Sequence, residues 1–281
     1  MNPYPFADLA LSRRLERAEG TSAVRNVEGR ARVSPERGAT WTEIAGAYAL
    51  FDGPESPITQ TFGLGLFQAP SAGDLAALES FFIDRGAPVF HEVSPIADPQ
   101  TVTLLNARGY QPVELTSVLY RVLRSPEGQD GQDTLAGRAN GERVGTVTVR
   151  HAGPDDAETY ARAAAEGWRE FGFDAFIHEM ARVYAACEGL DLFLAELDGR
   201  AIATGVLSIH DGVAHLAGAS TIPDGRRRGA QNALLDARLR YAAARGCDLA
   251  LMGALPGSGS QRNAERNGFR IAYTRIKWQK R

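Results

Sequence analysis

The sequence predicts an α/β fold in two halves, each with a mixed, mostly antiparallel sheet flanked by helices. The chain has 281 residues, which is room for two domains of moderate size. Hydrophobic residues make up 44% of it and charged residues 23%, the balance of a globular protein with a substantial core. Strand-like and helix-like segments alternate along the second half, and part of that order recurs in the first half.

The second half carries the clearer pattern. Asp198-Gly199 and Asp211-Gly212 each lie between apolar runs, which predicts three antiparallel strands joined by tight hairpins. The expected elements in chain order are a strand at 144–150, helices at 154–168 and 173–187, strands at 192–197, 201–209 and 213–222, a helix at 229–245, a strand at 249–254, a short helix at 263–267 and a strand at 270–278.

The long helix at 229–245 is predicted from its apolar period. Four residues repeat at helical spacing and indicate the buried face, namely Ala230, Leu234, Ala237 and Tyr241. Arg238 and Arg240 are expected to point away from that face.

The first half echoes part of this order. Strands are expected near 41–51 and 58–67, followed by a helix at 72–85, a strand at 89–93, a further helix and a last strand. Gly109-Tyr110 and Gly268-Phe269 both stand just before a last strand, which suggests duplication followed by divergence. Residues 125–142 are rich in glycine and polar residues and are typical of a linker, so the expected domains are 1–124 and 143–281.

Composition excludes several classes of protein. A net charge of -3 gives no general attraction to nucleic acid, and no apolar run approaches the ~18 residues of a membrane span. The two cysteines, Cys187 and Cys247, provide neither a disulfide framework nor a metal cluster. Without a basic segment before an apolar run at the N-terminus, no secretory signal is visible, and we expect a cytoplasmic location without metal.

The segment 219–239 carries the chemistry. A strand ends at Ile222, three arginines follow at Arg226, Arg227 and Arg228, and a helix begins near Gly229. The first amides of a helix have no intrahelical partner and lie at the positive end of its dipole, so together they form an anion site. Because glycine has no β-carbon, an anion can approach the backbone closely there. A solvated run of arginines is the alternative interpretation.

This loop resembles the coenzyme A diphosphate loop of the GCN5-related N-acetyltransferase (GNAT) family, Gln/Arg-x-x-Gly-x-Gly/Ala. Here it runs from Arg226 to Gln231, where glutamine replaces the small last residue and offers a hydrogen-bond donor. The resemblance implies acyl transfer from acetyl-CoA or another acyl-CoA to an amine. It also implies a set of cofactor-binding residues, with pantetheine along the strand end and diphosphate at the helix start: Ser220, Thr221, Ile222, Arg226, Arg227, Arg228, Gly229, Ala230, Gln231, Asn232 and Asn263.

The same resemblance implies where the acid and base lie. Position matching gives His215 as the general base, and strand alternation places it on one face with Thr221. A histidine hydrogen-bonded to a neighbour is the equally weighted alternative. The usual acid, a tyrosine, is replaced by Ala264; Tyr273 lies nearby in sequence, but core packing explains it more simply, so the acid is unassigned. Ser258 and Ser260 are interpreted as helix caps.

The acceptor is expected beside residues 166–179, where aromatic and acidic side chains alternate. Interior helix faces are the alternative interpretation of these aromatics. In the first half, residues 62–75 have no basic residue at the corresponding loop, which predicts a degenerate half that does not hold coenzyme A. The function expected is therefore N-acyltransfer to a small amine or a peptide. A non-catalytic acyl-CoA-binding module and a structural scaffold are the alternatives, and a homodimer is left open.

Overall fold

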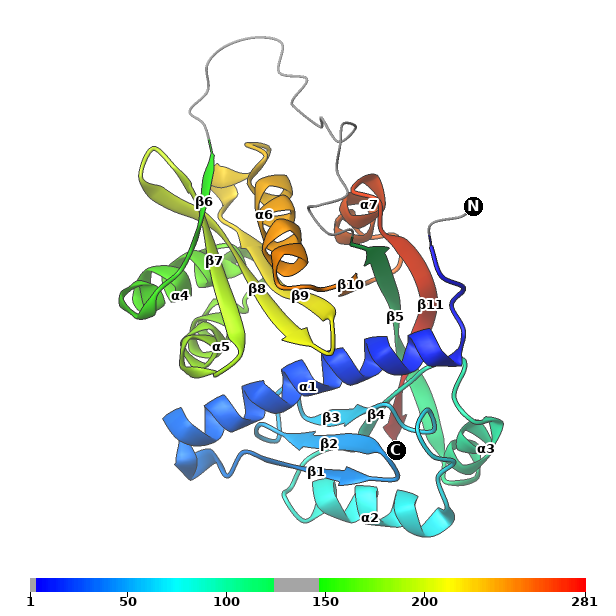
Figure 1. Cartoon of the computed structure of the whole chain (residues 1–281). Coiled ribbons are helices and arrows are strands. Elements are labelled where there is room, and N and C mark those ends of the chain that lie inside the picture. Colours follow the sequence, from blue (N-terminus) through cyan, green and yellow to red (C-terminus); the bar gives the residue numbers. More distant parts are fainter. Residues whose placement is uncertain (1–3, 124–146) are drawn as a thin grey trace. The chain divides into compact units, whose positions relative to one another are not determined.

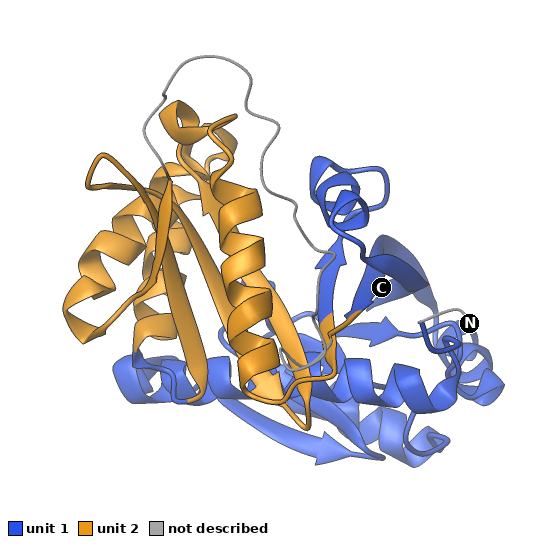
Figure 2. Cartoon of the chain, turned by 45° about the horizontal axis from the view of Figure 1, so that its top comes forward, with its two compact units in different colours: residues 1–121, 186–188, 251–281 blue, residues 122–185, 189–250 orange. Residues whose placement is uncertain are grey.

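The computed structural model describes residues 4–123 and 147–281. The chain divides into two compact units, which Figure 2 shows in blue and orange. Unit 1 comprises residues 1–121, 186–188 and 251–281, and unit 2 comprises residues 122–185 and 189–250. The predicted linker at 125–142 lies outside the described residues.

These units differ from the expected domains because the last strand belongs to unit 1. β11 (Arg270–Lys280) pairs antiparallel with both β4 (Phe90–Val93) and β5 (Tyr110–Val122). Its Trp278 lies in the apolar core of that unit. The C-terminal strand therefore completes the sheet that the first half begins (Figure 1).

The sheet of unit 1 follows the order β1-β2-β3-β4-β11-β5. Its β3–β4 pair is parallel and its other pairs are antiparallel. The remaining elements of this unit are α1 (Leu9–Val33), η1 (Pro35–Arg37), β1 (Thr40–Ile44), β2 (Ala47–Phe51), β3 (Gln60–Phe62), α2 (Ala72–Ile83), α3 (Pro99–Ala107) and α7 (Gly259–Arg266).

Helices cover both faces of this sheet. Val24 and Val27 of α1 pack with Leu50 of β2 in one apolar cluster. The neighbouring residue Phe51 belongs to a second cluster, together with Leu78 of α2. Because successive strand residues point to opposite faces, α1 lies on one face and α2 on the other. No helix was predicted at α1, and the helix predicted at 72–85 ends two residues later than α2.

Unit 2 contains the antiparallel order β9-β8-β7-β6. Its elements are β6 (Thr148–His151), η3 (Pro154–Asp156), α4 (Ala157–Glu166), η4 (Arg169–Phe171), α5 (Asp174–Ala186), β7 (Leu190–Leu197), β8 (Arg200–His210), β9 (Val213–Thr221), η5 (Pro223–Gly225) and α6 (Ala230–Ala244). β10 (Leu249–Ala254) crosses the boundary between the units. Asp198 and Asp211 adopt φ of 51° and 44° and close the two predicted hairpins, which are thereby confirmed.

The helices of unit 2 lie on opposite faces of its sheet. Val206 of β8 packs with Ala161 of α4 and Ala181 of α5. The preceding residue, Gly205, faces Arg238 of α6 instead. A mixed α+β architecture with mostly antiparallel sheets is therefore present, as the sequence predicted.

Candidate acyl-CoA site in unit 2

The N-terminus of α6 is open. Gly229 takes the N-cap position with φ of 80°, and no side chain caps this helix within the described residues. A β-carbon built at Gly229 would meet no atom within 4 Å. The turn is therefore not filled by neighbouring side chains, and an anion can reach its amides.

The three arginines of the loop differ in their partners. Arg226 pairs with Glu170 of η4, with 2.5 Å between Nη2 and Oε1. This ion pair holds the pKa of Glu170 below and that of Arg226 above their usual values. Arg227 and Arg228 are exposed and have no ion-pair partner in the described part of the chain. These two residues therefore supply the uncommitted positive charge.

Gln231 connects α6 to the end of β9. Its Nε2 donates to the backbone oxygen of Ser220 at 2.9 Å and to Oγ1 of Thr221 at 2.6 Å. The amide expected to face the diphosphate thus fixes the strand end. Ile222 N donates to Ile202 O at 3.0 Å. This amide is therefore already used, and the predicted pantetheine contacts would have to come from other backbone groups of residues 220–222.

A β-bulge changes which side chains share a face of β9. Ala217 pairs with Val206 and Ser220 with Thr204, so three steps on β9 oppose two steps on β8. His215, which pairs with Ser208, therefore shares its face with Ala217 and Ser220. The expectation that His215 and Thr221 share a face is wrong, because the bulge shifts the alternation by one residue.

His215 is enclosed by the α4–α5 side of unit 2. Its exposed fraction is 9%, and Ala217, two residues on, packs against the apolar cluster formed by these helices and β7 and β8. Ser220 Oγ donates to Ala164 O at 2.9 Å on the same face. The geometry places the predicted base beside the bulge but beneath the surface.

The sequence missed Arg238. Its exposed fraction is 3%, so the expectation that it points away from the apolar face of α6 is wrong. Leu234 and Ala242, one turn before and after it, are also buried. The spacing of four residues between Leu234, Arg238 and Ala242 was the signal that could have placed it inside.

Four other residues singled out in the sequence lie in unit 1. Asn263 is on α7, and its backbone oxygen accepts from Nδ2 of Asn267 at 2.8 Å. Its role toward pantetheine remains a prediction. Ser258 caps α7 by accepting from Gln261 N at 3.2 Å, as predicted, whereas Ser260 lies inside the helix. Tyr273 OH donates to Oε1 of Glu16 at 2.8 Å in the interior of unit 1.

The aromatic side chains between α4 and α5 are on the surface. Trp168, Phe171 and Phe173 are all exposed, and the Trp168 ring lies 5.7 Å and 6.5 Å from the other two ring centroids. Glu170 stands within this group and is paired with Arg226. Of the two interpretations of these three aromatics, the interior helix face is therefore wrong.

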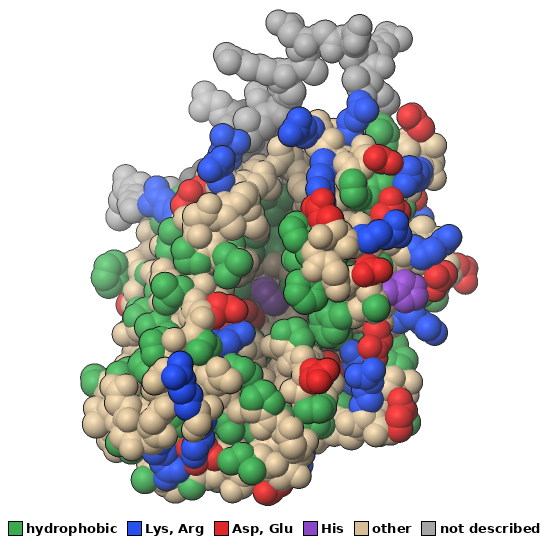
Figure 3. All heavy atoms as spheres, turned by 180° about the vertical axis from the view of Figure 1, so that it is seen from behind, with side chains coloured by type: hydrophobic (Ala, Val, Ile, Leu, Met, Phe, Trp, Pro, Cys, Tyr) green, Lys and Arg blue, Asp and Glu red, His purple; other side chains and the backbone are tan. Residues whose placement is uncertain are grey.

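The described residues contain no group of three or more His, Cys, Asp or Glu side chains able to hold a metal ion. None of the described helices is long and apolar enough to span a membrane. On the face drawn in Figure 3, described basic and acidic side chains are interspersed.

Comparisons with known proteins give a family match in the second part of the chain. Residues 132–257 match a family model described as an acetyltransferase (GNAT) domain. Similar solved structures include a GCN5-related N-acetyltransferase from Kribbella flavida, at 20% identity and TM-score 0.57, covering 93% of this chain and 95% of that one. A tandem GNAT protein from the clavulanic acid biosynthesis pathway matches at 13% identity and TM-score 0.56, covering 83% of this chain and 77% of that one. At these identities the similarity shows the fold. No curated protein matches the chain in sequence.

Proposed function

We propose that this chain, whose residues 132–257 match a GNAT acetyltransferase domain model, transfers an acyl group from an acyl-CoA directly to an amine. The domain match over residues 132–257 and the similarity in fold support the family resemblance seen in the sequence. The observation that carries the proposal is the open, glycine-capped start of α6 beside Arg227 and Arg228. The degenerate character of the first half remains part of the proposal.

Binding would begin at the diphosphate. The amides of the first turn of α6 and the positive end of its dipole bind an anion without any side chain moving. Arg227 and Arg228 add charge at the rim, where each can rotate toward phosphate oxygens. Pantetheine would then run back along β9 from Thr221 toward the bulge.

The reaction would take place near that bulge. The amine nitrogen attacks the thioester carbonyl, the carbonyl electrons move to oxygen, and the carbon–sulfur bond then breaks as the carbonyl re-forms. We assign the removal of the amine proton to His215, because an imidazole nitrogen can accept a proton. The leaving thiolate takes its proton from water, since no side chain is assigned as the acid.

The acceptor would bind at the exposed aromatic group. Trp168, Phe171 and Phe173 provide ring faces for the apolar body or the cation of an amine. Glu170 is already paired with Arg226, so a cationic acceptor would compete with this arginine. We infer a small amine with an apolar part, or a peptide amine, and a cytoplasmic location in keeping with two buried free cysteines.

Two glycines at opposite ends of α6 give a matched test of cofactor binding. Gly229 and Gly246 have φ of 80° and 78°, and neither has an atom within 4 Å of a built β-carbon. Gly229→Val and Gly246→Val should therefore cost similar stability, but only the first should weaken coenzyme A binding, by about tenfold or more. Calorimetric titration measures both. Equal affinities in the two variants would remove the diphosphate assignment.

Thiol release over a panel of amines separates the enzyme from the non-catalytic alternative. Binding of acyl-CoA without release for any amine would favour a regulatory module. The variant His215→Ala should lower the rate of thiol release. Undiminished turnover at every pH would exclude His215 as the base.

A further inference from the structure

The guanidinium of Arg238 joins two strands at the bulge. Its Nη1 donates to Val206 O of β8 at 3.0 Å and to Ala217 O of β9 at 3.2 Å, and its Nε lies 3.3 Å from Leu234 O. Ala217 is the last paired residue before the bulge. Arg238 therefore fixes the two carbonyls between which the regular ladder stops.

Arg238 is unlike the other buried arginines. Within the described residues, the arginines that are buried are Arg30, Arg238 and Arg275. Arg30 lies 2.9 Å from Asp52, and Arg275 is surrounded by glutamates. Arg238 has no carboxylate partner in the described part of the chain and hydrogen-bonds only to backbone carbonyls.

A buried charge without a counter-charge is costly. Burial lowers the pKa of Arg238 to about 10, which still leaves the guanidinium protonated at neutral pH. A hydrophobic side chain of the same length would avoid this cost. Burying this charge therefore destabilises the folded state, and packing alone does not explain why an arginine stands here.

The surrounding backbone is shaped to admit the guanidinium. A β-carbon on Gly205 would lie 2.9 Å from both Cζ and Nη1 of Arg238. Gly205 stands opposite the extra residue of the bulge, since Thr204 pairs with Ser220 and Val206 with Ala217. The missing side chain thus places the cation directly against the irregular part of β9.

The bulge is also where the thioester would lie, an inference that rests on the proposed function. A strand rises about 3.3 Å per residue, so the stretch from Ile222 back to Gly218 spans about 13 Å. That length is comparable with an extended pantetheine arm. A diphosphate at the start of α6 therefore brings the thioester close to Ala217 and Gly218.

We propose that Arg238 is a positioning residue for acyl transfer, which fixes the carbonyls at the bulge and provides the counter-charge for the anion formed there. Negative charge appears first on the carbonyl oxygen during amine attack and then on sulfur when the carbon–sulfur bond breaks. The proton leaves the amine for the base, and the thiolate is reprotonated by water. A fixed cation in a low-dielectric interior stabilises both anions without reorganisation. The hydrogen bond from Arg238 to Ala217 O also polarises that peptide group, which makes the N–H of Gly218 a stronger donor.

The test compares Arg238→Met, Arg238→Lys and Gly205→Ala with the wild-type chain, using Arg240→Met as the control. Arg240 is exposed on the same helix and pairs with Asp236. Arg238→Met should lower kcat about tenfold or more and leave the Kd of coenzyme A within about twofold. Tm should fall, because the carbonyls of Val206 and Ala217 lose their donor. Arg238→Lys, which keeps the charge, should recover part of kcat. Gly205→Ala displaces the guanidinium and should lower kcat with coenzyme A affinity retained.

The outcomes separate this inference from the proposed function. If the wild-type chain neither binds coenzyme A nor releases thiol, the proposed function fails and the role of Arg238 falls with it. If the wild-type chain turns over but Arg238→Met or Gly205→Ala keeps full kcat, only the inference is overturned. If Arg238→Met loses coenzyme A affinity by the same factor as kcat/KM, the inference is likewise overturned. It is also overturned if kcat of Arg238→Lys is no higher than kcat of Arg238→Met. If Arg238→Met does not fold, kcat of Arg238→Lys and of Gly205→Ala tests the inference.

Discussion

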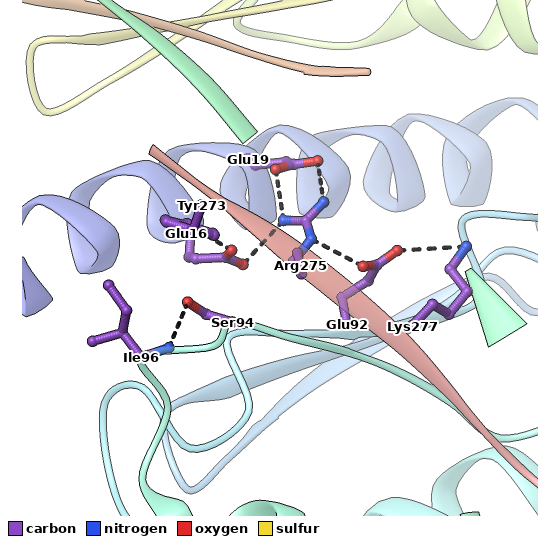
Figure 4. Close-up of polar contacts among 8 residues, drawn as sticks. All are labelled: Glu16, Glu19, Glu92, Ser94, Ile96, Tyr273, Arg275 and Lys277. Carbon is purple, nitrogen blue, oxygen red and sulfur yellow. Dashed lines mark hydrogen bonds and ion pairs between the residues drawn. The ribbon is translucent and has the colours of Figure 1, made fainter. Parts of the chain in front are cut away.

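Arg275 of β11 and Glu19 of α1 form a two-point ion pair, in which Nη1 and Nη2 donate to Oε2 and Oε1 at 2.8 Å and 2.9 Å (Figure 4). The same guanidinium binds Glu16 at 3.1 Å and Glu92 of β4 at 2.9 Å. The Arg275 side chain is 2% exposed. Three carboxylates from two elements thus converge on one cation of the last strand and hold it in unit 1.

Glu16 makes this cluster sensitive to pH. Its pKa is raised to about 7, chiefly by burial, against the opposing attraction of Arg275; Glu19 and Glu92 raise it and the hydrogen bond from Tyr273 lowers it. Since the folded pKa exceeds the unfolded value of 4.5, the folded state binds more protons between these pH values. The contribution of Glu16 to stability is therefore complete below about pH 4.5 and is lost as the pH rises to about 7.

We expect Glu16→Gln to remove this slope. The difference in unfolding free energy between wild type and variant should fall by at most a few kcal/mol from about pH 4.5 to 7. Urea unfolding at several pH values measures it, with Glu36→Gln, an exposed position on η1, as the control. A difference that stays constant over this range would contradict the prediction.

Gly167 allows the end of α4 to approach the strand that precedes the anion site. A β-carbon there would lie 2.0 Å from Oγ of Ser220 and 3.0 Å from N and O of Thr221. Its φ of -68° suits any residue, so Gly167→Ala tests the contact alone. We expect a loss of about 1–3 kcal/mol in stability and weaker coenzyme A binding, because the strand end must move.

Thermal unfolding and calorimetry measure these two effects. Gly259→Ala is the control, since its added β-carbon would meet no atom within 4 Å. Adding Ser220→Ala to Gly167→Ala should restore only part of the stability, because the clash with the Thr221 backbone remains. If Gly167→Ala matches the wild type in both measurements, this contact does not constrain the site.

Glu170 and a bound diphosphate are expected to compete for Arg226. The ion pair is exposed on both sides, so its own contribution is small. Glu170→Gln should release the arginine and tighten coenzyme A binding by about two- to fivefold at low salt. Binding titrations check this, with Asp236→Asn, which releases Arg240 on the outer side of α6, as the control. Unchanged or weaker binding in Glu170→Gln would show that Arg226 does not reach the anion.

The hairpins and the loop could be predicted because their signals are local. Asp198-Gly199 and Asp211-Gly212 favour a left-handed turn between apolar strands, wherever the hairpin lies in the fold. Gly229 likewise marks the start of α6. The bulge had no such signal, since Gly218 and Ala219 read as ordinary strand residues, and it changed the face assigned to His215.

The elements that were missed bury polar side chains. α1 places Glu16, Asn26 and Arg30 inside, so its apolar period is weak and the sequence does not indicate a buried helix. Arg238 was assigned to the outside for the same reason. Charged residues are rarely buried without partners. The partners of Glu16 and Arg30 are distant in sequence, and those of Arg238 are backbone carbonyls, so the sequence does not reveal them.

The sequence by itself determined the strands and helices of unit 2 and the open turn at Gly229, and it indicated a resemblance to the GNAT family, because hydrophobic period and glycine conformation act over a few residues. Only the tertiary structure decided that the last strand completes unit 1, that the bulge reorients His215, and that a guanidinium lies beneath that bulge. Each of these depends on which distant group satisfies a buried hydrogen bond or charge, and that choice is made by the packing of whole elements.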